Sequence, residues 1–172
     1  MTRTLLAVID DDPTGAQAEA GVPLLLEWGE EALRGREAAG AVHLLTNSRA
    51  LDDGEAYAIV RDAAAAAVAQ MPERRIVLRG DSTLRGHLLA EHEAVCDAAF
   101  PGRSPVLVLV PALPAAGRVT AGGVHWLERD GRRVPLGETE YAADRVFGYR
   151  SSRLLDWAAE RSGAQSSSRE LR

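Results

Sequence analysis

The nine residues from Arg79 to His87, RGDSTLRGH, combine the side chains best suited to hold a small polar ligand. They follow the apolar run Ile76–Leu78 and contain an acid, two hydroxyls, two arginines, a histidine and two glycines. Carboxylate and hydroxyl groups can bond the hydroxyls of a ligand, and arginine can bond a carboxylate or phosphate through two parallel bonds. The glycines let the backbone approach a ligand closely. This segment therefore predicts a binding loop for a small, polar, anionic molecule.

A second segment of the same kind, DDDPTG at Asp10–Gly15, follows the apolar run Leu5–Ile9. Adjacent carboxylates repel one another, so capping of a helix explains one of the three acids more easily than all of them. Carboxylates in this place can coordinate Mg²⁺ or accept a proton from a substrate hydroxyl. The segment is therefore a second candidate for ligand binding.

Two more polar segments follow apolar runs: Thr46–Arg49 comes after Val42–Leu45, and Pro111–Arg118 comes after Val106–Val110. In open α/β sheets, ligands bind outside the carboxyl ends of the strands, so we expect the four segments to form one site. The candidates for catalysis are Asp12 and Asp81. The candidates for substrate binding are Asp11, Asp12, Thr14, Gly15, Ser48, Arg49, Asp81, Ser82, Arg85, Gly86, His87 and Arg118.

Structural roles are the alternative for several of these residues. Ser48 and Arg49 can cap the following helix, Asp81 and Arg85 can form an ion pair, and His87 can serve only as the entry to a helix. We expect Arg85 to bind the carboxylate of the ligand, with Arg118 as its rival. No metal site is expected, because the histidines show no metal-ligand spacing and Cys96 is the single cysteine.

Apolar runs alternate with helical stretches along most of the chain. Strands are expected at Leu5–Ile9, Val42–Leu45, Ile76–Leu78 and Val106–Val110, with a short one at Val22–Leu26. Helices are expected at 30–39, 53–70, 88–100 and 153–161. This pattern predicts an α/β fold with a mostly parallel sheet and helices on both faces. The Asp130-Gly131 pair predicts the turn of a C-terminal β-hairpin before the last helix.

Composition limits the classes of protein that fit. The 172 residues are 46% hydrophobic, enough for a domain with a core, which we place at 1–162, with a disordered Ser-rich tail at 163–172. A net charge of −5 argues against a nucleic-acid partner, and the lack of a long apolar run argues against a membrane, so a cytoplasmic protein is expected. All 20 basic residues are arginine, so the chain itself offers no lysine for a P-loop or a Schiff base.

Taken in order, the polar segments resemble the N-terminal, sugar-acid-binding domain of the four-carbon acid sugar kinase family. The matching segments are DDPTGAQ at 11–17, TNSRAL at 46–51, GDSTLRGH at 80–87 and PALPAAGR at 111–118, then GGVH at 122–125, PLGETE at 135–140 and FGYRSS at 147–152. The resemblance implies that this domain binds threonate, erythronate or an oxo-tetronate. It also implies a second domain that binds ATP and Mg²⁺ and transfers a phosphoryl group to a terminal hydroxyl.

The resemblance ends where such a nucleotide-binding domain would begin, and the sequence has no glycine-rich nucleotide loop. The chain is then a fragment, a truncated product or one half of a split enzyme, and we expect it to be inactive without a separate ATP-binding domain or chain. A sugar-acid-binding module without turnover is the alternative.

A different class also shares a motif with this chain. Asp10-x-Asp12-x-Thr14 behind an apolar strand, with Thr46 behind another, resembles the first two motifs of haloacid-dehalogenase-type phosphatases. Their third motif requires a lysine, which this chain does not have. The phosphatase is therefore kept as a second alternative.

Overall fold

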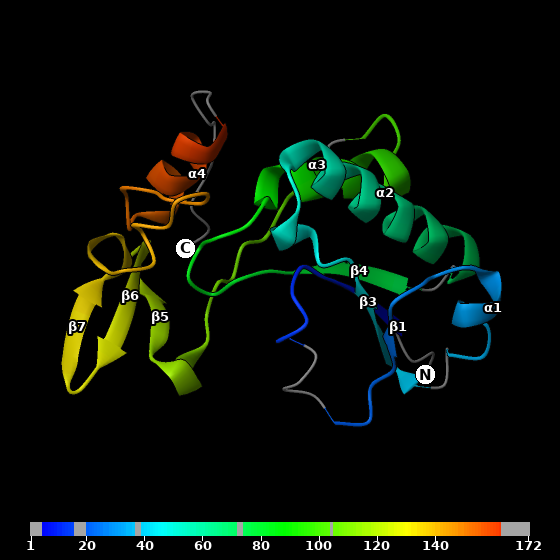
Figure 1. Ribbon diagram of the computed structural model, residues 1–172, viewed down its shortest axis with the longest axis horizontal. Coiled ribbons are helices and arrows are strands. Elements are labelled where there is room, and N and C mark those ends of the chain that lie inside the picture. The colour runs from blue at the N-terminus through cyan, green and yellow to red at the C-terminus, as the bar shows by residue number, and fades with distance from the viewer. Residues whose placement is uncertain (1–4, 16–19, 37–38, 72–73, 104, 163–172) are drawn as a thin grey trace. The chain divides into compact units, whose positions relative to one another are not determined.

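The computed structural model describes residues 5–15, 20–36, 39–71, 74–103 and 105–162 (Figure 1). The chain divides into two compact units. Unit 1 contains Met1–Gly80 and Gly86–Leu107, and unit 2 contains Asp81–Arg85 and Val108–Arg172. The short loop Asp81–Arg85 therefore belongs to a different unit from the residues on both sides of it.

Unit 1 is built on a parallel sheet of four strands in the order β2-β3-β1-β4. The strands are β1 (Leu5–Asp10), β2 (Leu24–Leu25), β3 (Ala41–Leu45) and β4 (Arg74–Arg79). The register places Asp10 opposite Leu45 on one side and opposite Arg79 on the other. The last residue of β1 therefore lies between two neighbouring strand ends, where a parallel sheet exposes its ligand-binding edge.

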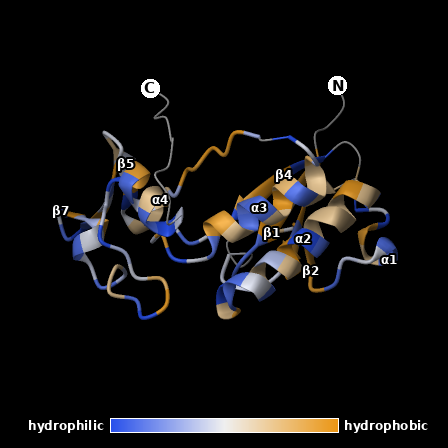
Figure 2. Cartoon of the chain, turned by 90° about the horizontal axis from the view of Figure 1, so that it is seen from above, coloured by the Kyte–Doolittle hydropathy of each residue, from blue (hydrophilic) through white to orange (hydrophobic). Residues whose placement is uncertain are grey.

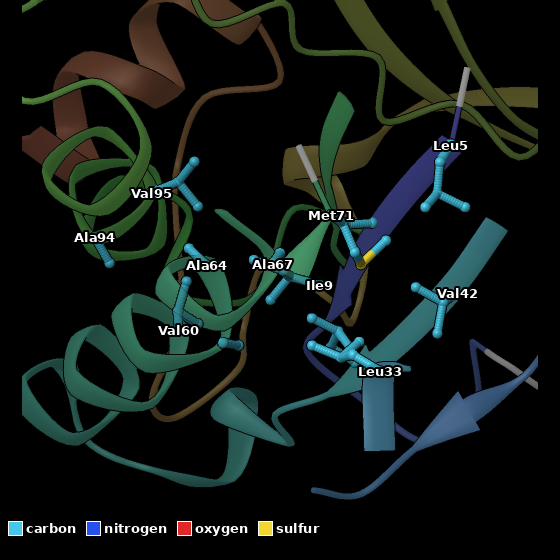
Figure 3. Packing of buried hydrophobic residues seen from close by; sticks show 13 residues of the cluster. Leu5, Ile9, Leu33, Val42, Val60, Ala64, Ala67, Met71, Ala94 and Val95 are labelled. Atoms are coloured by element: carbon cyan, nitrogen blue, oxygen red, sulfur yellow. The ribbon is translucent and has the colours of Figure 1, made fainter. Parts of the chain in front are cut away.

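Helices α2 (Asp53–Gln70) and α3 (Leu88–Ala99) pack against each other over the sheet of unit 1 (Figure 1). Small side chains on α2, including Ala64 and Ala67, let the helix approach the strands closely, and they pack with Ile9, Val42 and Val95 in one core cluster (Figure 3). Both helices alternate between hydrophobic and hydrophilic residues along their length, as helices with one buried face do (Figure 2).

Unit 2 contains an antiparallel sheet of strands β5 (Arg118–Ala121), β6 (Val124–Arg129) and β7 (Arg132–Pro135), followed by helix α4 (Leu154–Ser162). The β6–β7 turn uses Asp130 and Gly131, both with positive φ (53° and 71°), as the predicted Asp-Gly turn requires. Short 3₁₀ turns occupy Pro114–Ala116 and Leu136–Glu138 here, and Ser48–Ala50 in unit 1.

The predicted α/β class, with its parallel sheet and C-terminal hairpin and helix, is confirmed. Helix α1 (Glu30–Leu33) is shorter than the predicted 30–39, because Gly35 adopts a left-handed φ of 78° just after it. The predicted tail at 163–172 lies outside the described residues. None of the described helices is long and apolar enough to cross a membrane.

The predicted strand at Val106–Val110 is wrong for this structure, which places no strand there. Val106 and Val110 are 82% and 72% exposed. The apolar sequence favours a strand, but a strand also needs a neighbouring backbone for its hydrogen bonds, and none of the described strands pairs with this segment.

Helix α2 should depend measurably on its N-terminal cap. Asp52 accepts a hydrogen bond from the Glu55 amide (2.9 Å), and Glu55 accepts one from the Asp52 amide (3.3 Å), which forms a capping box. We expect Asp52→Ala to lower the free energy of unfolding by about 1 kcal/mol. Urea denaturation followed by circular dichroism at the helix wavelength measures the change. Arg61→Ala, an exposed substitution inside the same helix, should be nearly neutral, and equal losses in the two variants would contradict the role of the cap.

Candidate functional site

The site in unit 1 begins with Asp11, which directly follows the buried strand β1. Asp11 is only 2% exposed, and its carboxylate accepts two hydrogen bonds from Arg49, at 2.8 Å from Nη2 and 3.0 Å from Nε. The same guanidinium donates through Nη1 to Asp12 Oδ2 (3.1 Å). One arginine thus bridges two neighbouring acids, which offsets their mutual repulsion.

Asp10 is a buried structural group. Its side chain is fully buried, and it contacts His43 Nδ1 at 3.1 Å and Arg79 Nη1 at 3.2 Å. The Asp10 carbonyl accepts a hydrogen bond from the Thr46 hydroxyl (2.9 Å). The last residue of β1 is therefore fixed by its two neighbouring strands and has no exposed carboxylate to offer a substrate.

Ser48 also lies inside unit 1, fully buried, and donates to Glu91 Oε1 of α3 (2.6 Å). This bond ties the loop after β3 to helix α3. The predicted contact of Ser48 with a substrate would need this buried hydroxyl to become accessible, whereas its neighbour Arg49 keeps 17% of its side chain exposed. In the described chain, Ser48 therefore serves to hold the loop after β3 against α3.

His87 stands at the entry to α3, where it is 6% exposed. Its Nε2 donates to the carbonyl of Leu51 (2.9 Å), and its Nδ1 contacts Asp53 (2.5 Å). The two ring nitrogens thus contact the first residue of α2 and the residue before its N-cap, in line with the alternative structural role for His87.

Two of the predicted glycines lie close to charged side chains of unit 1. A side chain at Gly15 would come within 2.0 Å of the Arg79 guanidinium. Gly86 has a φ of 125°, and a Cβ there would lie 3.3 Å from Asp11 Oδ2. Both glycines therefore allow the backbone to lie against the charged groups of unit 1. Thr14 is exposed and donates to Asp12 Oδ1 through its amide (2.7 Å).

The two acids of this site differ in acidity. Burial raises the pKa of Asp11 to about 7, although Arg49 acts in the opposite direction. Burial also acts to raise the pKa of Asp12, but the hydrogen bonds from Thr14 and the charge of Arg49 hold it below its usual value. Asp12 is therefore the acid that stays ionised and partly accessible, with 23% of its side chain exposed.

The site in unit 2 is centred on the loop Asp81–Arg85. Asp81 accepts hydrogen bonds from the Thr83 amide (3.0 Å) and from Arg85 Nε (2.7 Å). Burial acts to raise the pKa of Asp81, but the bonds from Thr83 and Arg85 outweigh burial and lower it. The loop therefore carries an ionised, half-buried carboxylate at neutral pH.

Two buried side chains hold the backbone of this loop in place. Burial lowers the pKa of His125, so its ring is neutral. Its Nε2–H donates to the Ser82 carbonyl (2.8 Å), and its Nδ1 contacts the Thr120 hydroxyl (2.9 Å). The Tyr149 hydroxyl, whose pKa is raised by burial, donates to the Thr83 carbonyl (2.8 Å). His125 and Tyr149 bind backbone carbonyls of the loop, and any loop sequence has such carbonyls. The sequence of the loop therefore could not point to these two residues.

The two rival arginines lie on the same tyrosine. The guanidinium carbons of Arg85 and Arg118 are 5.4 and 5.5 Å from the centre of the Tyr141 ring, within the range of a cation–π contact. Tyr141 comes from the segment between two of the matching motifs and was not among the candidates. Its aromatic face next to two cations is the feature that could have drawn attention to it.

The charges of these two arginines are balanced differently. Arg85 contacts two carboxylates, Asp81 at 2.7 Å and Asp144 at 3.6 Å. Arg118 donates to two neutral hydroxyls, those of Ser82 and Tyr141, both at 3.3 Å. Its Nε is buried and has no hydrogen-bond partner among the described residues. Among the residues that the structure describes, Arg118 thus forms no ion pair, and an anionic ligand would match its charge.

The residues present do not fit a magnesium site. Among residues 5–162, apart from the gaps in the description, no three acidic, histidine or cysteine side chains are placed to hold a metal ion. Asp11 and Asp12, the acids considered for Mg²⁺, both bind Arg49 instead. A cation at this place would have to displace the guanidinium, so no step involving a metal is assigned to this chain.

The class of protein follows from a match to a known family model. Residues 6–171 match the model described as the sugar-binding N-terminal domain, so the chain belongs to that family. It is the sugar-binding N-terminal domain of the four-carbon acid sugar kinases.

Individual relatives agree with this family. The chain is 34% identical over 148 residues to a D-erythronate kinase of Heliobacterium modesticaldum and 30% identical over 160 residues to a D-threonate kinase of Salmonella typhimurium. These matches cover 81% and 90% of this chain but only 32% and 36% of the two kinases. The chain thus spans about a third of the length of the curated relatives it matches.

A solved structure with 29% identity has the same fold. It is a domain of unknown function from Bordetella bronchiseptica, determined with bound citrate as a domain-swapped dimer in two crystal forms. The TM-scores are 0.70 and 0.69, and the match covers 88% of this chain and 38% of the Bordetella chain in the first form.

The raised pKa of Asp11 should appear in the stability of the chain. An unfolded aspartate releases its proton near pH 3.8, whereas Asp11 in the folded chain keeps it to about pH 7. The folded state therefore binds more protons in this window, so the free energy of unfolding should fall as the pH rises from about 4 to about 7. Glu91, whose pKa is also raised by burial, acts in the same direction. Urea denaturation at several pH values measures this slope.

Asp11→Asn should flatten this slope, because asparagine does not titrate. Asp12→Asn is the matched control, since the pKa of Asp12 is lowered and its contribution to stability is lost only as the pH falls through that lowered value. Equal slopes in the wild type and the Asp11→Asn variant would contradict the assignment.

Proposed function

We propose that this chain binds a four-carbon sugar acid, of the threonate, erythronate or oxo-tetronate class, and presents it for phosphorylation by ATP. The observation that carries the proposal is Arg118, a half-buried arginine whose hydrogen-bond partners among the described residues are the neutral hydroxyls of Ser82 and Tyr141. The carboxylate of a sugar acid would place a negative charge next to the Arg118 guanidinium. The family and the two kinase relatives support the choice of substrate class.

Arg118 is a better partner for the carboxylate than Arg85, the residue expected from the sequence. Arg85 already binds Asp81 and Asp144, so a substrate carboxylate would compete with two protein carboxylates for it. At Arg118 the substrate would meet a buried Nε without a partner, and satisfying such a group favours binding. Tyr141 then supports both guanidinium groups, and Arg85 chiefly holds Asp81.

Asp81 is the proposed partner of a substrate hydroxyl. Its lowered pKa keeps it ionised, so it can accept a hydrogen bond, and makes it a weak base. A weak base suffices, because phosphoryl transfer depends mainly on positioning and charge stabilisation. Ser82 offers a hydroxyl on the same loop. Asp12, ionised and partly exposed in unit 1, is kept as the second candidate for catalysis.

The phosphatase alternative is disfavoured by Asp10. In that mechanism the first acid of the motif would attack the phosphorus atom, but the Asp10 side chain is fully buried against His43 and Arg79. A nucleophile must reach its substrate, so this residue would have to leave its buried contacts.

ATP and Mg²⁺ belong to the proposed reaction through a separate nucleotide-binding domain or chain. The kinase relatives are about three times as long as the match, which leaves them room for such a domain. The proposal places this reaction in the cytoplasm. The proposal also includes assembly with a second copy of this chain, by analogy with the domain-swapped dimer of the Bordetella relative.

Replacing Arg118 should weaken binding of the acid. We expect Arg118→Ala to raise the dissociation constant of D-threonate or D-erythronate about ten- to a hundredfold, because a charge-assisted bond contributes about 1.5–3 kcal/mol. Arg118→Lys should recover part of the loss, since it keeps the charge without the planar fork. Isothermal titration calorimetry of the purified chain measures both.

Arg132→Ala is the matched control, because Arg132 is an exposed arginine of the same unit. It should bind like the wild type. Loss of binding in Arg85→Ala together with normal binding in Arg118→Ala would move the carboxylate to Arg85 and contradict the assignment.

Turnover should require a nucleotide-binding domain. We expect no phosphorylated threonate, by ³¹P NMR, when the chain alone is mixed with Mg·ATP and threonate, and turnover when the remaining part of the D-threonate kinase relative is added. Asp81→Asn should then remove turnover and change the affinity for threonate only a few-fold. The control is Asp130→Asn in the exposed β6–β7 turn, which should leave both turnover and affinity unchanged. Binding without turnover in the complete mixture would indicate a binding module, and hydrolysis of a phosphate ester by the chain alone would indicate a phosphatase.

A further inference from the structure

The two hydroxyls that contact Arg118 form a cluster with it inside unit 2, to which all three residues belong. Arg118 Nη1 donates to Ser82 Oγ, and Arg118 Nη2 donates to the Tyr141 hydroxyl, both at 3.3 Å. Each of the three residues is half-buried, so the cluster is held by its surroundings and can still be reached by a small ligand. The direction of the two hydrogen bonds decides which ligand groups it can bind.

Both hydroxyls keep a hydrogen to donate. A hydroxyl has one donor position and accepts through its oxygen, whereas a guanidinium only donates. Arg118 therefore occupies an acceptor position on each oxygen, and each O–H hydrogen must point away from the guanidinium. Among the described residues of unit 2, no group accepts a hydrogen bond from Ser82 Oγ or Tyr141 Oη. The cluster thus presents one cation and two O–H donors.

Contacts inside unit 2 fix the position of both hydroxyls. The carbonyl of Ser82 accepts a hydrogen bond from His125 Nε2 (2.8 Å), which holds the loop at that residue. The ring of Tyr141 contacts two guanidinium groups, with the carbons of Arg85 and Arg118 at 5.4 and 5.5 Å from its centre. Donors that are already in place lose little conformational entropy when a ligand binds, which favours affinity.

An ionised carboxylate is the group that such a cluster fits best. It has two oxygens and about four lone-pair positions, and it carries no hydrogen of its own. It can therefore accept hydrogen bonds from a guanidinium and from two hydroxyls at once, and bonds to an ionised acceptor are the stronger ones. The charge of Arg118 also polarises the two hydroxyls that it contacts, which strengthens them as donors. A hydroxymethyl group has neither the charge nor the second oxygen.

We propose that Tyr141 and Ser82 bind the substrate carboxylate together with Arg118, each by donating its O–H, and that these donors make the site select an acid over the corresponding polyol. The inference rests on the proposed function and adds to it a binding residue, Tyr141, and the discrimination between acid and polyol. A carboxylate fixed here leaves the opposite end of the four-carbon chain as the end presented for phosphoryl transfer.

Removal of single hydroxyls tests the proposal. Tyr141→Phe keeps the ring against both arginines and removes only the O–H, and Ser82→Ala does the same at the other position. We expect each substitution to raise the dissociation constant of D-threonate about tenfold, because a hydrogen bond to a charged group is lost. Isothermal titration calorimetry of the purified chain measures the change, and circular dichroism checks that the variants are folded.

Tyr57→Phe is the matched control, because it removes a tyrosine hydroxyl from unit 1, where that hydroxyl donates to Asp97 (2.6 Å). It should bind threonate like the wild type. The second ligand is D-threitol, which has a hydroxymethyl group in place of the carboxylate. The wild type should bind D-threitol about a hundredfold or more weakly than threonate, because the cation and both O–H donors then meet no anion.

A ring-fluorinated tyrosine at position 141 separates donation to the ligand from acceptance from Arg118. Fluorine withdraws electrons from the ring, so it makes the phenol O–H a stronger donor and its oxygen a weaker acceptor. If Tyr141 donates to the carboxylate, fluorination should tighten the binding of threonate at a pH where the fluorinated phenol is neutral. The same measurement remains informative if Tyr141→Phe folds poorly, since the fluorinated ring has nearly the natural shape.

The possible failures are distinguishable. A wild type that binds neither threonate nor erythronate would overturn the proposed function and this inference with it. A wild type that binds threonate, with unchanged affinity in Tyr141→Phe and Ser82→Ala, would overturn only the inference. Weaker binding on fluorination would show that the Tyr141 hydroxyl serves as an acceptor for Arg118 and does not touch the ligand. Equal affinities for threonate and threitol would remove the selection for an acid.

Discussion

The bridging of Asp11 and Asp12 by Arg49 is the interaction on which the site of unit 1 depends. A parallel sheet brings the end of its inner strand β1 into the interior, and here that end carries three consecutive acids. Asp10 and Asp11 are almost completely buried, and buried charges are tolerated only when they are paired and hydrogen-bonded. Arg79 from the neighbouring strand and Arg49 from the loop after β3 provide those pairs.

The use of arginine in place of lysine suits this arrangement. Arg49 donates to both oxygens of Asp11 and to one oxygen of Asp12, which needs three nitrogen atoms in a planar group. An ammonium group could place its charge there but could not make the two parallel bonds to Asp11. The close packing of Gly15 against Arg79 and of Gly86 against Asp11 shows how little space is left around these groups.

In unit 2 the loop Asp81–Arg85 presents polar side chains, so its backbone needs support from other residues to keep one conformation. Neutral His125 and Tyr149 bind the backbone carbonyls of the loop, so they fix its path without adding charge. Arg85 is matched by Asp81 and Asp144, and Arg118 is left with neutral partners. The unit thus places a guanidinium with neutral hydrogen-bond partners next to an aromatic ring, a combination that could accept a carboxylate.

The sequence by itself determined the α/β class, the strands β1, β3 and β4, the capped helix α2 and the Asp-Gly hairpin, because each follows from local periodicity, capping or turn chemistry. It also located the polar loops and the family. Only the tertiary structure decided which charges are matched. Arg49 binds Asp11 and Asp12, and Arg85 binds two carboxylates, whereas the partners of Arg118 among the described residues are neutral hydroxyls. These contacts join residues far apart in the chain, so no local pattern encodes them. The strand expected at Val106–Val110 failed for the same reason, since a strand exists only where another backbone accepts its hydrogen bonds.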